Sequence, residues 1–209
     1  MSRETYMDAL MMAVRYGEYV TIGGGEPTIH PEFFDFLDKT IELYELGDIK
    51  MPPFMVTNGK IKGKALKLLD KYIDQERPVY VQLSQDDFHD HIDPEVVQRY
   101  RAHERLKKAE RYSNHRRNDN GGAGINELHN ILPVGRAKEN DLGTVPIWAG
   151  SRVDCCCEDA IVDPEGVVWS CGCKHTKLGH ISDHSVLDEY VRDYAHQGGF
   201  EPEEMREAT

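Results

Sequence analysis

Five cysteines cluster late in this 209-residue chain, and their spacing suits metal chemistry. Cys155, Cys156 and Cys157 are adjacent, and Cys171 and Cys173 follow after a short segment. A disulfide framework would be spread along the chain and would leave no odd cysteine. The cluster therefore indicates a reduced compartment and a metal or iron–sulfur site. Three adjacent cysteines cannot all point the same way into a core, which argues against chance burial.

The segment between the two cysteine groups is predicted to form a β-hairpin that folds them toward each other. Residues 160–162 and 167–170 have strand character, and the turn DPEG at 163–166 places a proline and a glycine where a hairpin needs them. His175 can add a nitrogen ligand. Zinc takes about four tetrahedral ligands, and an iron–sulfur cluster takes cysteine thiolates, so both stay open. Adjacent cysteines are awkward ligands for one ion, so a set using two of the three is an alternative.

A second stretch, VTIGGGEPTIHP at residues 20–31, has residue types that suit ligand binding. Its β-branched residues predict the end of a buried strand. Three glycines follow this strand: Gly23, Gly24 and Gly25. Because glycines have no Cβ atom, a ligand can reach their backbone amides and carbonyls. Glu26 and Pro27 come next, and a helix is predicted to begin near Pro31. Such a turn binds ligands in α/β proteins, and the alternative is a tight turn that binds nothing.

Alternating strands and helices are predicted to position this stretch. Strands are expected at residues 19–22, 54–56, 78–83 and 125–132, and helices at 2–16, 31–46, 62–73 and from 94 onward. This alternation indicates an α/β fold with a parallel sheet or barrel. Polar and glycine residues recur just past the strand ends, at 23–26, 57–59 and 84–87. In barrels and open sheets that edge carries the ligand.

Several residues are predicted to set the helix ends and buried faces. Ser2 and Asp93 are expected N-caps, and Gly47 is an expected C-terminal stop. In the first helix, four residues have the spacing of one buried face: Met7, Leu10, Met11 and Val14. These methionines are interpreted as core residues.

Composition limits the classes of function. Hydrophobic residues are 39% and charged residues 30%, an ordinary mix for a soluble globular protein. No apolar run approaches membrane-spanning length and no signal pattern is seen, so a cytoplasmic location without membrane contact is expected. The net charge of -12 argues against non-specific nucleic-acid binding. A basic run at 99–117 has no interleaved aromatic residues, which favours a solvated helix face over a nucleic-acid patch.

The ordered motifs resemble those of the radical S-adenosylmethionine (radical SAM) superfamily. Residues 23–27, with His30 and Pro31, are similar to the GGEP motif, and residues 57–59 are similar to TNG. Residues 83–86 resemble the next strand end, and 133–137 resemble a P-x-GRA element. The cysteine-rich hairpin followed by 177–181 resembles extensions of SPASM or twitch type, which hold auxiliary clusters.

The resemblance implies a fold and a cofactor. The fold is a partial (β/α) barrel over residues 1–150, missing its first strand, with a small cysteine-rich β-hairpin extension over 151–209. The superfamily uses a 4Fe–4S cluster to reduce S-adenosylmethionine (SAM), and the resulting 5′-deoxyadenosyl radical takes a hydrogen atom from substrate.

The resemblance also implies site residues. Gly24, Gly25 and Glu26 would meet the methionine amino group of SAM, largely through backbone atoms. The whole implied SAM set is Gly23, Gly24, Gly25, Glu26, Pro27, Thr57, Asn58, Ser84, Asp86, Val134 and Gly135. Within it, Asn58, Ser84 and Asp86 would lie near the carboxylate or ribose, and Val134 and Gly135 near the adenine. The implied ligands of an auxiliary iron–sulfur cluster, or of zinc, are Cys155, Cys156, Cys157, Cys171, Cys173 and His175.

One departure from the superfamily limits the expected activity. The CxxxCxxC motif that holds the 4Fe–4S cluster lies upstream of GGEP, and this sequence has no cysteine before Cys155. The first strand and cluster loop are therefore interpreted as absent, so this chain alone is not expected to cleave SAM. A start codon assigned too late, a shortened chain and a natural relative without the cluster each account for this.

Substrate and partners are left open. Peptide modification is common among radical SAM proteins with such extensions, so the resemblance favours a peptide substrate, with a small molecule as the alternative. The missing strand leaves an open barrel edge, which a partner chain would cover. A second hypothesis is a non-catalytic barrel without the cluster, which binds a ligand or a protein and carries a structural zinc site.

Overall fold

The computed structural model describes residues 1–16, 19–85, 91–103, 122–127, 160–170 and 177–183, with the single residues 174, 185, 186 and 188. The chain divides into two compact units, residues 13–131 and residues 1–12 together with 132–209. The predicted boundary at residue 150 falls outside the described residues, so the division into 1–150 and 151–209 stays a prediction.

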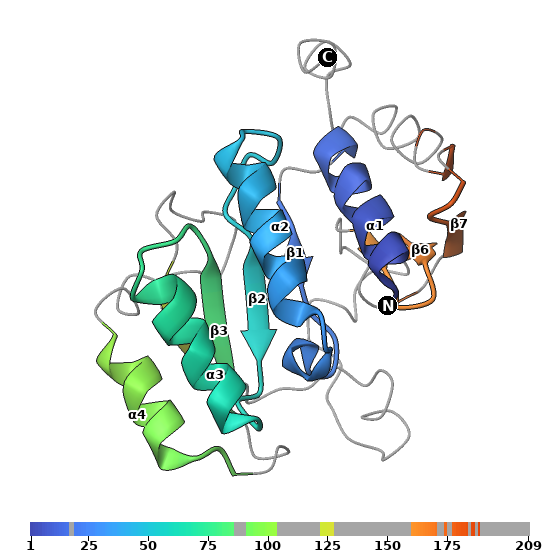
Figure 1. The fold of residues 1–209 in the computed structure, drawn as a ribbon. Helices are drawn as coiled ribbons and strands as arrows, with labels where there is room; N and C mark the ends of the chain where they lie inside the picture. Colours follow the sequence, from blue (N-terminus) through green and yellow to red (C-terminus); the bar gives the residue numbers. More distant parts are fainter. Residues whose placement is uncertain are drawn as a thin grey trace, which may run out of the picture. The chain divides into compact units, whose positions relative to one another are not determined.

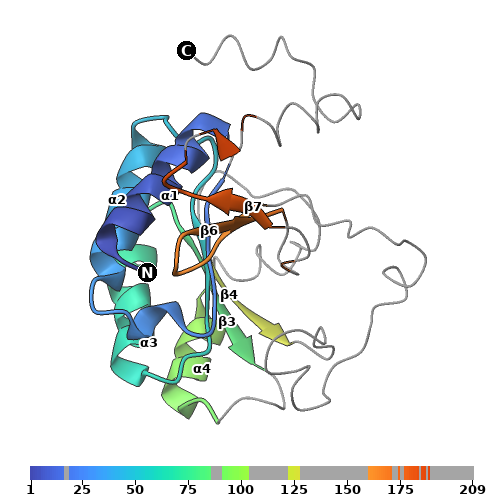
Figure 2. The same cartoon turned by 90° about the vertical axis from the view of Figure 1, so that its right-hand side faces the viewer.

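A parallel four-stranded sheet forms the centre of the larger unit (Figure 1). Its strands are β1 (Thr21–Ile22), β2 (Phe54–Thr57), β3 (Tyr80–Gln85) and β4 (Gly122–Glu127), in that spatial order. Three helices alternate with the strands: α2 (Phe33–Glu45), α3 (Lys62–Leu68), which continues as the π-helix η2 (Leu69–Ile73), and α4 (Pro94–Ala102). Figure 2 shows these helices on one side of the sheet. The α/β prediction is confirmed, and no closed barrel is present among the described strands.

The core of this unit lies between the sheet and its helices. Successive side chains of a strand point to opposite faces. Among the strand side chains that the structure describes, Met55, Val81 and Leu83 lie in the core, each at most 1% exposed, and Ile22 packs against it. The helices contribute Leu37, Ile41, Ala65, Leu68, Leu69, Tyr72, Val96 and Tyr100. These residues follow helical spacing, so the core is that of amphipathic helices on a sheet.

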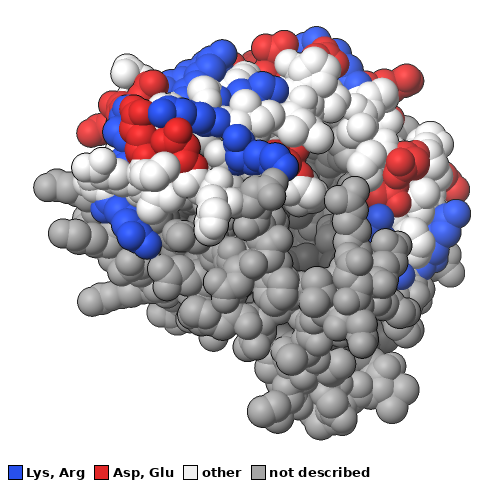
Figure 3. Space-filling view, turned by 90° about the horizontal axis from the view of Figure 1, so that it is seen from below, with Lys and Arg blue, Asp and Glu red and all other residues white. Residues whose placement is uncertain are grey.

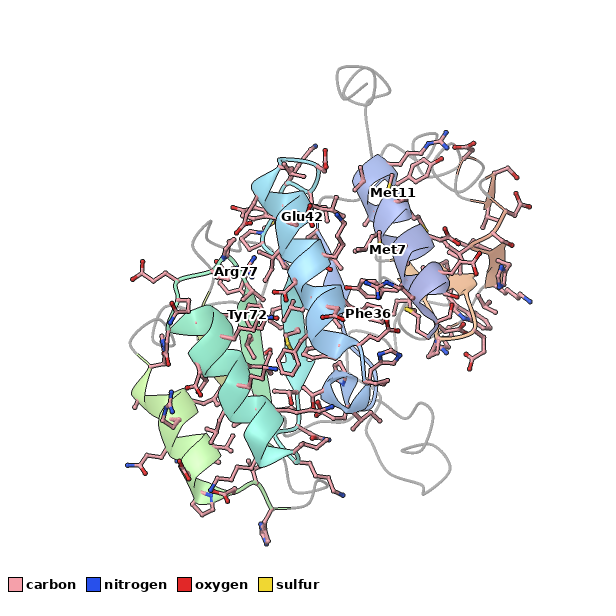
Figure 4. The ribbon with its side chains drawn as sticks, in the orientation of Figure 1. Met7, Met11, Phe36, Glu42, Tyr72 and Arg77 are labelled. Atoms are coloured by element: carbon pink, nitrogen blue, oxygen red, sulfur yellow. The ribbon has the colours of Figure 1, made fainter. Side chains whose placement is uncertain are left out.

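Side chains at the helix surface add polar contacts around this core. Asp38 accepts a hydrogen bond from Arg77 Nη1 at 2.9 Å and another from Lys71 Nζ. Arg77 also lies over the Tyr72 ring, with 5.7 Å from its Cζ atom to the ring centroid (Figure 4). Burial, followed by the negative charge of Asp38, raises the pKa of Tyr72. Arg77 therefore joins the end of η2 to α2.

Several element boundaries differ from the sequence-based expectation; the strand expected at 78–83, for example, runs from Tyr80 to Gln85. The strand expected at 125–132 begins instead at Gly122, and it pairs with β3 from Tyr80 opposite Gly122 to Gln85 opposite Glu127. Glycines weaken strand propensity, but pairing with an ordered neighbouring strand overrides that preference. The helix expected from Pro31 begins at Phe33, after a 3₁₀ turn η1 at Pro27–Ile29.

The predicted helix caps are confirmed. Ser2 Oγ accepts the Thr5 N–H at 3.0 Å at the start of α1 (Arg3–Tyr16). Asp93 Oδ1 accepts the Glu95 N–H at 2.9 Å at the start of α4. Gly47 takes the left-handed φ of +84° after α2. The buried stripe predicted for α1 is wrong at Met11, which is 55% exposed, because burial in this helix centres on Tyr6 and Leu10.

The predicted hairpin is confirmed in the smaller unit. Strands β5 (Ile161–Val162) and β6 (Val167–Trp169) pair antiparallel, and β7 (Lys177–His180) adds a third strand beside β6. Gly166 takes a φ of +84° in the turn, and a Cβ atom there would lie 2.7 Å from His180 Nε2. A last helix is predicted from the sequence at 186–194, and it lies almost wholly outside the described residues.

A buried carboxylate organises this hairpin. Asp163 is 7% exposed and is the only charged side chain in the buried class among the described residues. Its Oδ1 accepts the N–H groups of Glu165 at 3.2 Å and Val167 at 2.9 Å. Its Oδ2 accepts Trp169 Nε1–H at 2.9 Å and lies 3.5 Å from Lys174 Nζ. Burial alone would raise the pKa of Asp163, but these hydrogen bonds and the Lys174 charge outweigh burial and hold it below its usual value.

Acid is expected to destabilise the three-stranded sheet through Asp163. Because its folded pKa is lowered, its contribution is fully present above the unfolded pKa of about 3.9 and is lost as pH falls through the folded pKa. Asp163→Asn should lower the free energy of unfolding by about 2 kcal/mol at pH 7 and weaken this acid dependence. Trp169 fluorescence during urea unfolding, in a Trp148→Phe background, measures both effects.

Glu165→Gln is the matched control, because Glu165 is an exposed carboxylate in the same turn. It should keep the stability and acid midpoint of the parent. If Asp163→Asn behaved like Glu165→Gln, the buried carboxylate would not hold the hairpin.

Candidate ligand-binding site

Three exposed glycines follow β1, and we call Gly23, Gly24 and Gly25 the glycine arc. Gly24 has a φ of +116°, a conformation that residues with side chains rarely adopt. A Cβ atom added at any of the three glycines would meet no heavy atom within 4 Å. The arc is therefore a stretch of exposed backbone with room for a ligand beside its amides and carbonyls.

The side chain of Glu26 ties the end of the arc to the end of β2. Oε1 accepts Thr28 N–H at 3.0 Å and lies 3.0 Å from Thr57 Oγ1. Oε2 lies 3.1 Å from Thr57 Oγ1 and accepts Asn58 N–H at 2.6 Å. Hydrogen bonds to a charged acceptor are about twice as strong as neutral ones. One carboxylate thus joins the segment after β1 to the end of β2, across the 31 residues that separate Glu26 from Thr57 in sequence.

Lys64, in the first turn of α3, contacts the segment that follows Glu26. Its Nζ donates to the carbonyl oxygen of Thr28, a residue that is 1% exposed. Pro27 occupies the first position of η1, where its missing N–H has no cost. The segment 26–28 is therefore fixed from both sides, while the preceding glycine arc is open.

The residues after Thr57 form a tight turn against β3. Gly59 N–H donates to Thr57 Oγ1 at 3.1 Å, and Lys60 N–H donates to Asn58 Oδ1 at 3.0 Å. Gly59 has a φ of +67°, and a Cβ atom there would lie 2.6 Å from Leu83 Cδ1. This close approach explains the need for glycine at that position.

The parallel strands bring three of the predicted groups to one edge. Thr57 lies opposite Leu83 in the register of β2 and β3, so Ser84 follows at the same edge as Asn58. Ser84 is 6% exposed. The glycine arc follows β1, whose Ile22 lies opposite Met55 of β2. The arc, the Thr57–Asn58 pair and Ser84 thus occupy the carboxyl ends of neighbouring strands, where ligands bind in α/β folds.

The negative charge of Glu26 affects the ionisation of Tyr100, a buried residue of α4. Burial, and after it the charge of Glu26, raises the pKa of Tyr100. The Tyr100 hydroxyl donates to the Ala65 carbonyl at 3.2 Å. This hydroxyl is neutral at ordinary pH and serves as a structural link between α4 and α3, not as a general base.

The remaining predicted site residues lie outside the described residues. These are Asp86, Val134, Gly135, Cys155, Cys156, Cys157, Cys171, Cys173 and His175. Within the described ranges, no group of three or more His, Cys, Asp or Glu side chains is placed to hold a metal ion. The auxiliary metal site therefore stays a prediction.

Two features of the site were missed by sequence reasoning. Glu26 was expected to meet the methionine amino group of SAM largely through backbone atoms, and the contacts of its carboxylate to Thr57 and Asn58 were not foreseen. Its position before Pro27 is a possible signal, since an acidic residue at a helix start accepts backbone N–H groups. Lys64 carries no such signal, because lysine at a helix surface is common.

In the described part of the basic run, Arg99 is engaged in ion pairs. Arg99 Nη2 lies 2.8 Å from Asp70 Oδ1 and 3.1 Å from Asp74 Oδ2. In Figure 3, Lys and Arg side chains are interspersed with Asp and Glu over the described part of the surface that is in view. Both observations favour the solvated helix face over a nucleic-acid patch.

No known family model, curated protein or solved structure matches the chain. None of the helices that the structure describes has the length and apolar character needed to cross a membrane. The function is therefore inferred from the sequence motifs and the geometry of the glycine arc.

Proposed function

We propose that this chain binds SAM at the glycine arc, as part of a radical SAM-type enzyme built on a partial (β/α) barrel. The observation that carries the proposal is the exposed glycine arc, where an added Cβ atom would have no neighbour within 4 Å. Glu26, the next residue, links this arc to the end of β2 by accepting the Asn58 N–H. The resemblance of residues 23–27 and 57–59 to the GGEP and TNG motifs supports the choice of ligand.

The chemistry of the arc suits the methionine end of SAM. An ammonium group needs hydrogen-bond acceptors and a carboxylate needs donors, and exposed glycine backbone offers both. Asn58, at the neighbouring strand end, adds a side-chain amide. When bound, SAM would supply a 5′-deoxyadenosyl radical and release methionine on receiving one electron from a 4Fe–4S cluster, whose CxxxCxxC ligands would have to come from outside this sequence. The role of the described residues is to bind and orient that cofactor, and the substrate is a peptide or a small molecule.

An auxiliary iron–sulfur cluster at the cysteine-rich extension belongs to the same proposal. Its ligands would come from Cys155, Cys156, Cys157, Cys171 and Cys173, with His175 as a further donor. Iron and sulfide measured after anaerobic purification would support the cluster. Stoichiometric zinc without iron would favour a structural zinc site in a non-catalytic binding module.

Calorimetric titration of the purified chain with SAM tests the proposed site. We expect saturable binding of one SAM per chain. We also expect 5′-methylthioadenosine, which lacks the amino-acid end of SAM, to bind more weakly by about tenfold or more, a difference in binding free energy of about 1.4 kcal/mol. Absence of SAM binding at millimolar concentration, or equal affinity for both compounds, would contradict the proposal.

A further inference from the structure

We infer that Glu26 is a positioning residue of the glycine-arc site, which holds Asn58 in place through its carboxylate and leaves ligand contact to the backbone. This inference rests on the proposed function, since it assigns a role within the same site. An acidic side chain beside a site for an ammonium group would ordinarily be expected to bind that ammonium group directly. The inference instead gives the Glu26 carboxylate a role in holding neighbouring protein groups.

The carboxylate of Glu26 is already committed to protein donors. Its two oxygens accept the N–H groups of Thr28 and Asn58 and share the Thr57 hydroxyl, at 2.6 to 3.1 Å. A carboxylate has about four acceptor positions, and three donor groups engage them, with the Thr57 hydroxyl shared between the two oxygens. An ammonium group of a ligand would have to compete with these donors to bind Glu26. The backbone carbonyls of the arc are therefore the acceptors left for it.

The contact to Asn58 determines how the neighbouring strand end faces the arc. The 2.6 Å hydrogen bond fixes the Asn58 backbone relative to Glu26, and Asn58 Oδ1 accepts the Lys60 N–H at 3.0 Å. An amide oxygen engaged by a backbone N–H sets the orientation of the whole side-chain amide. The amide NH₂ group of Asn58 is thus presented in a fixed direction, as a donor for a ligand oxygen.

Thr57 completes this arrangement and offers a second way to disturb it. Its hydroxyl donates to the Glu26 carboxylate and accepts the Gly59 N–H at 3.1 Å. Thr57→Ser keeps the hydroxyl, whereas Thr57→Val keeps the shape and removes both hydrogen bonds. Glu26→Gln replaces one carboxylate oxygen with an NH₂ group. Because this group is a donor, it cannot accept the hydrogen bonds that the replaced oxygen accepts from N–H and O–H groups.

The experiment compares Glu26→Gln, Thr57→Val and Thr57→Ser with the parent chain. The control Glu42→Gln makes the same chemical change at an exposed position of α2. Amide hydrogen exchange of residues 57–60 is measured without ligand, and affinities for SAM and 5′-methylthioadenosine are measured by calorimetry. The exchange measurement needs no ligand, so it decides the positioning role even if SAM does not bind and the proposed function fails.

Glu26→Gln and Thr57→Val are expected to speed exchange at residues 57–60 by about tenfold, as for the loss of one hydrogen bond to a charged group. SAM affinity should fall by a similar factor, while 5′-methylthioadenosine affinity stays unchanged. Thr57→Ser and Glu42→Gln should match the parent. Unchanged exchange in both Glu26→Gln and Thr57→Val would overturn the inference. A loss of SAM affinity in Glu26→Gln with no change in exchange would also overturn it, because the carboxylate would then bind the ligand directly.

Discussion

Gly25→Ala is expected to weaken SAM binding by about 100-fold, or about 2.7 kcal/mol, without destabilising the fold. A Cβ atom at Gly25 would meet no heavy atom within 4 Å, so the folded protein accommodates it. The same Cβ atom would occupy the space beside the backbone in which we place the methionine end of SAM. The free energy of unfolding should stay level or rise by about 0.5 kcal/mol, because alanine restricts the unfolded chain. Calorimetry and urea unfolding measure the two effects.

Gly63→Ala is the matched control for this change. Gly63 lies in α3, and its added Cβ atom also meets no heavy atom within 4 Å. Because Gly63 is the second residue of α3, alanine there should raise the free energy of unfolding by less than the value of about 1 kcal/mol for a helix interior, with SAM affinity unchanged. Equal SAM affinity for Gly25→Ala and Gly63→Ala would show that the ligand does not approach the glycine arc.

Gly59→Ala is expected to lower the free energy of unfolding by about 3 kcal/mol. The left-handed φ of +67° costs alanine about 1 kcal/mol. Its Cβ atom would lie 2.6 Å from Leu83 Cδ1 and 3.0 Å from Ile92 Cγ2, and forcing atoms into a packed core costs about 1–3 kcal/mol. Urea unfolding followed by circular dichroism measures the loss.

A double-mutant cycle with Leu83→Ala identifies the contact that causes this loss. Leu83 is fully buried, so Leu83→Ala alone should cost about 2–5 kcal/mol. It also removes the atom that the new Cβ would strike. In the Leu83→Ala background, Gly59→Ala should therefore cost only about 1 kcal/mol, a strongly non-additive result. Strict additivity would show that crowding by Leu83 is not the reason for glycine at this position.

These two glycines belong to the two motifs that led to the proposed ligand, yet their surroundings differ. Gly25 borders empty space, whereas Gly59 is pressed against β3. The first pattern is what a ligand-contacting backbone requires, and the second is what a close turn requires. In the proposed site, the GGEP-like segment would therefore meet the ligand along its backbone, and Gly59 of the TNG-like segment would support the turn that carries Asn58.

Much of the larger unit could be predicted from local pattern. Leu37, Ile41, Leu68 and Tyr72 recur with helical spacing, and all are buried. Caps such as Asp93 depend on contacts within two residues, so the sequence reveals them directly. The DPEG hairpin was predictable for the same reason, since turn residues encode their own backbone conformation.

Features that depend on distant residues could not be predicted. The start of β4 at Gly122 follows from its register with Tyr80 in β3, which no local propensity encodes. The strand β7 contains a glycine and charged or polar residues, and it forms by pairing with β6. The contact of Glu26 with Thr57 depends on the meeting of two parallel strand ends. Sequence motifs indicated that these residues share a site, but not which of them supports the others.

The most direct test of SAM binding at the glycine arc is a titration of the chain labelled with ¹⁵N at its 18 glycines. SAM is added while the glycine amide resonances are followed by NMR, with assignments from single glycine variants. We predict saturable shifts at Gly23, Gly24 and Gly25, and none at Gly63 or at Gly179 of β7. Shifts confined to other glycines, or no shifts at saturating SAM, would contradict this account.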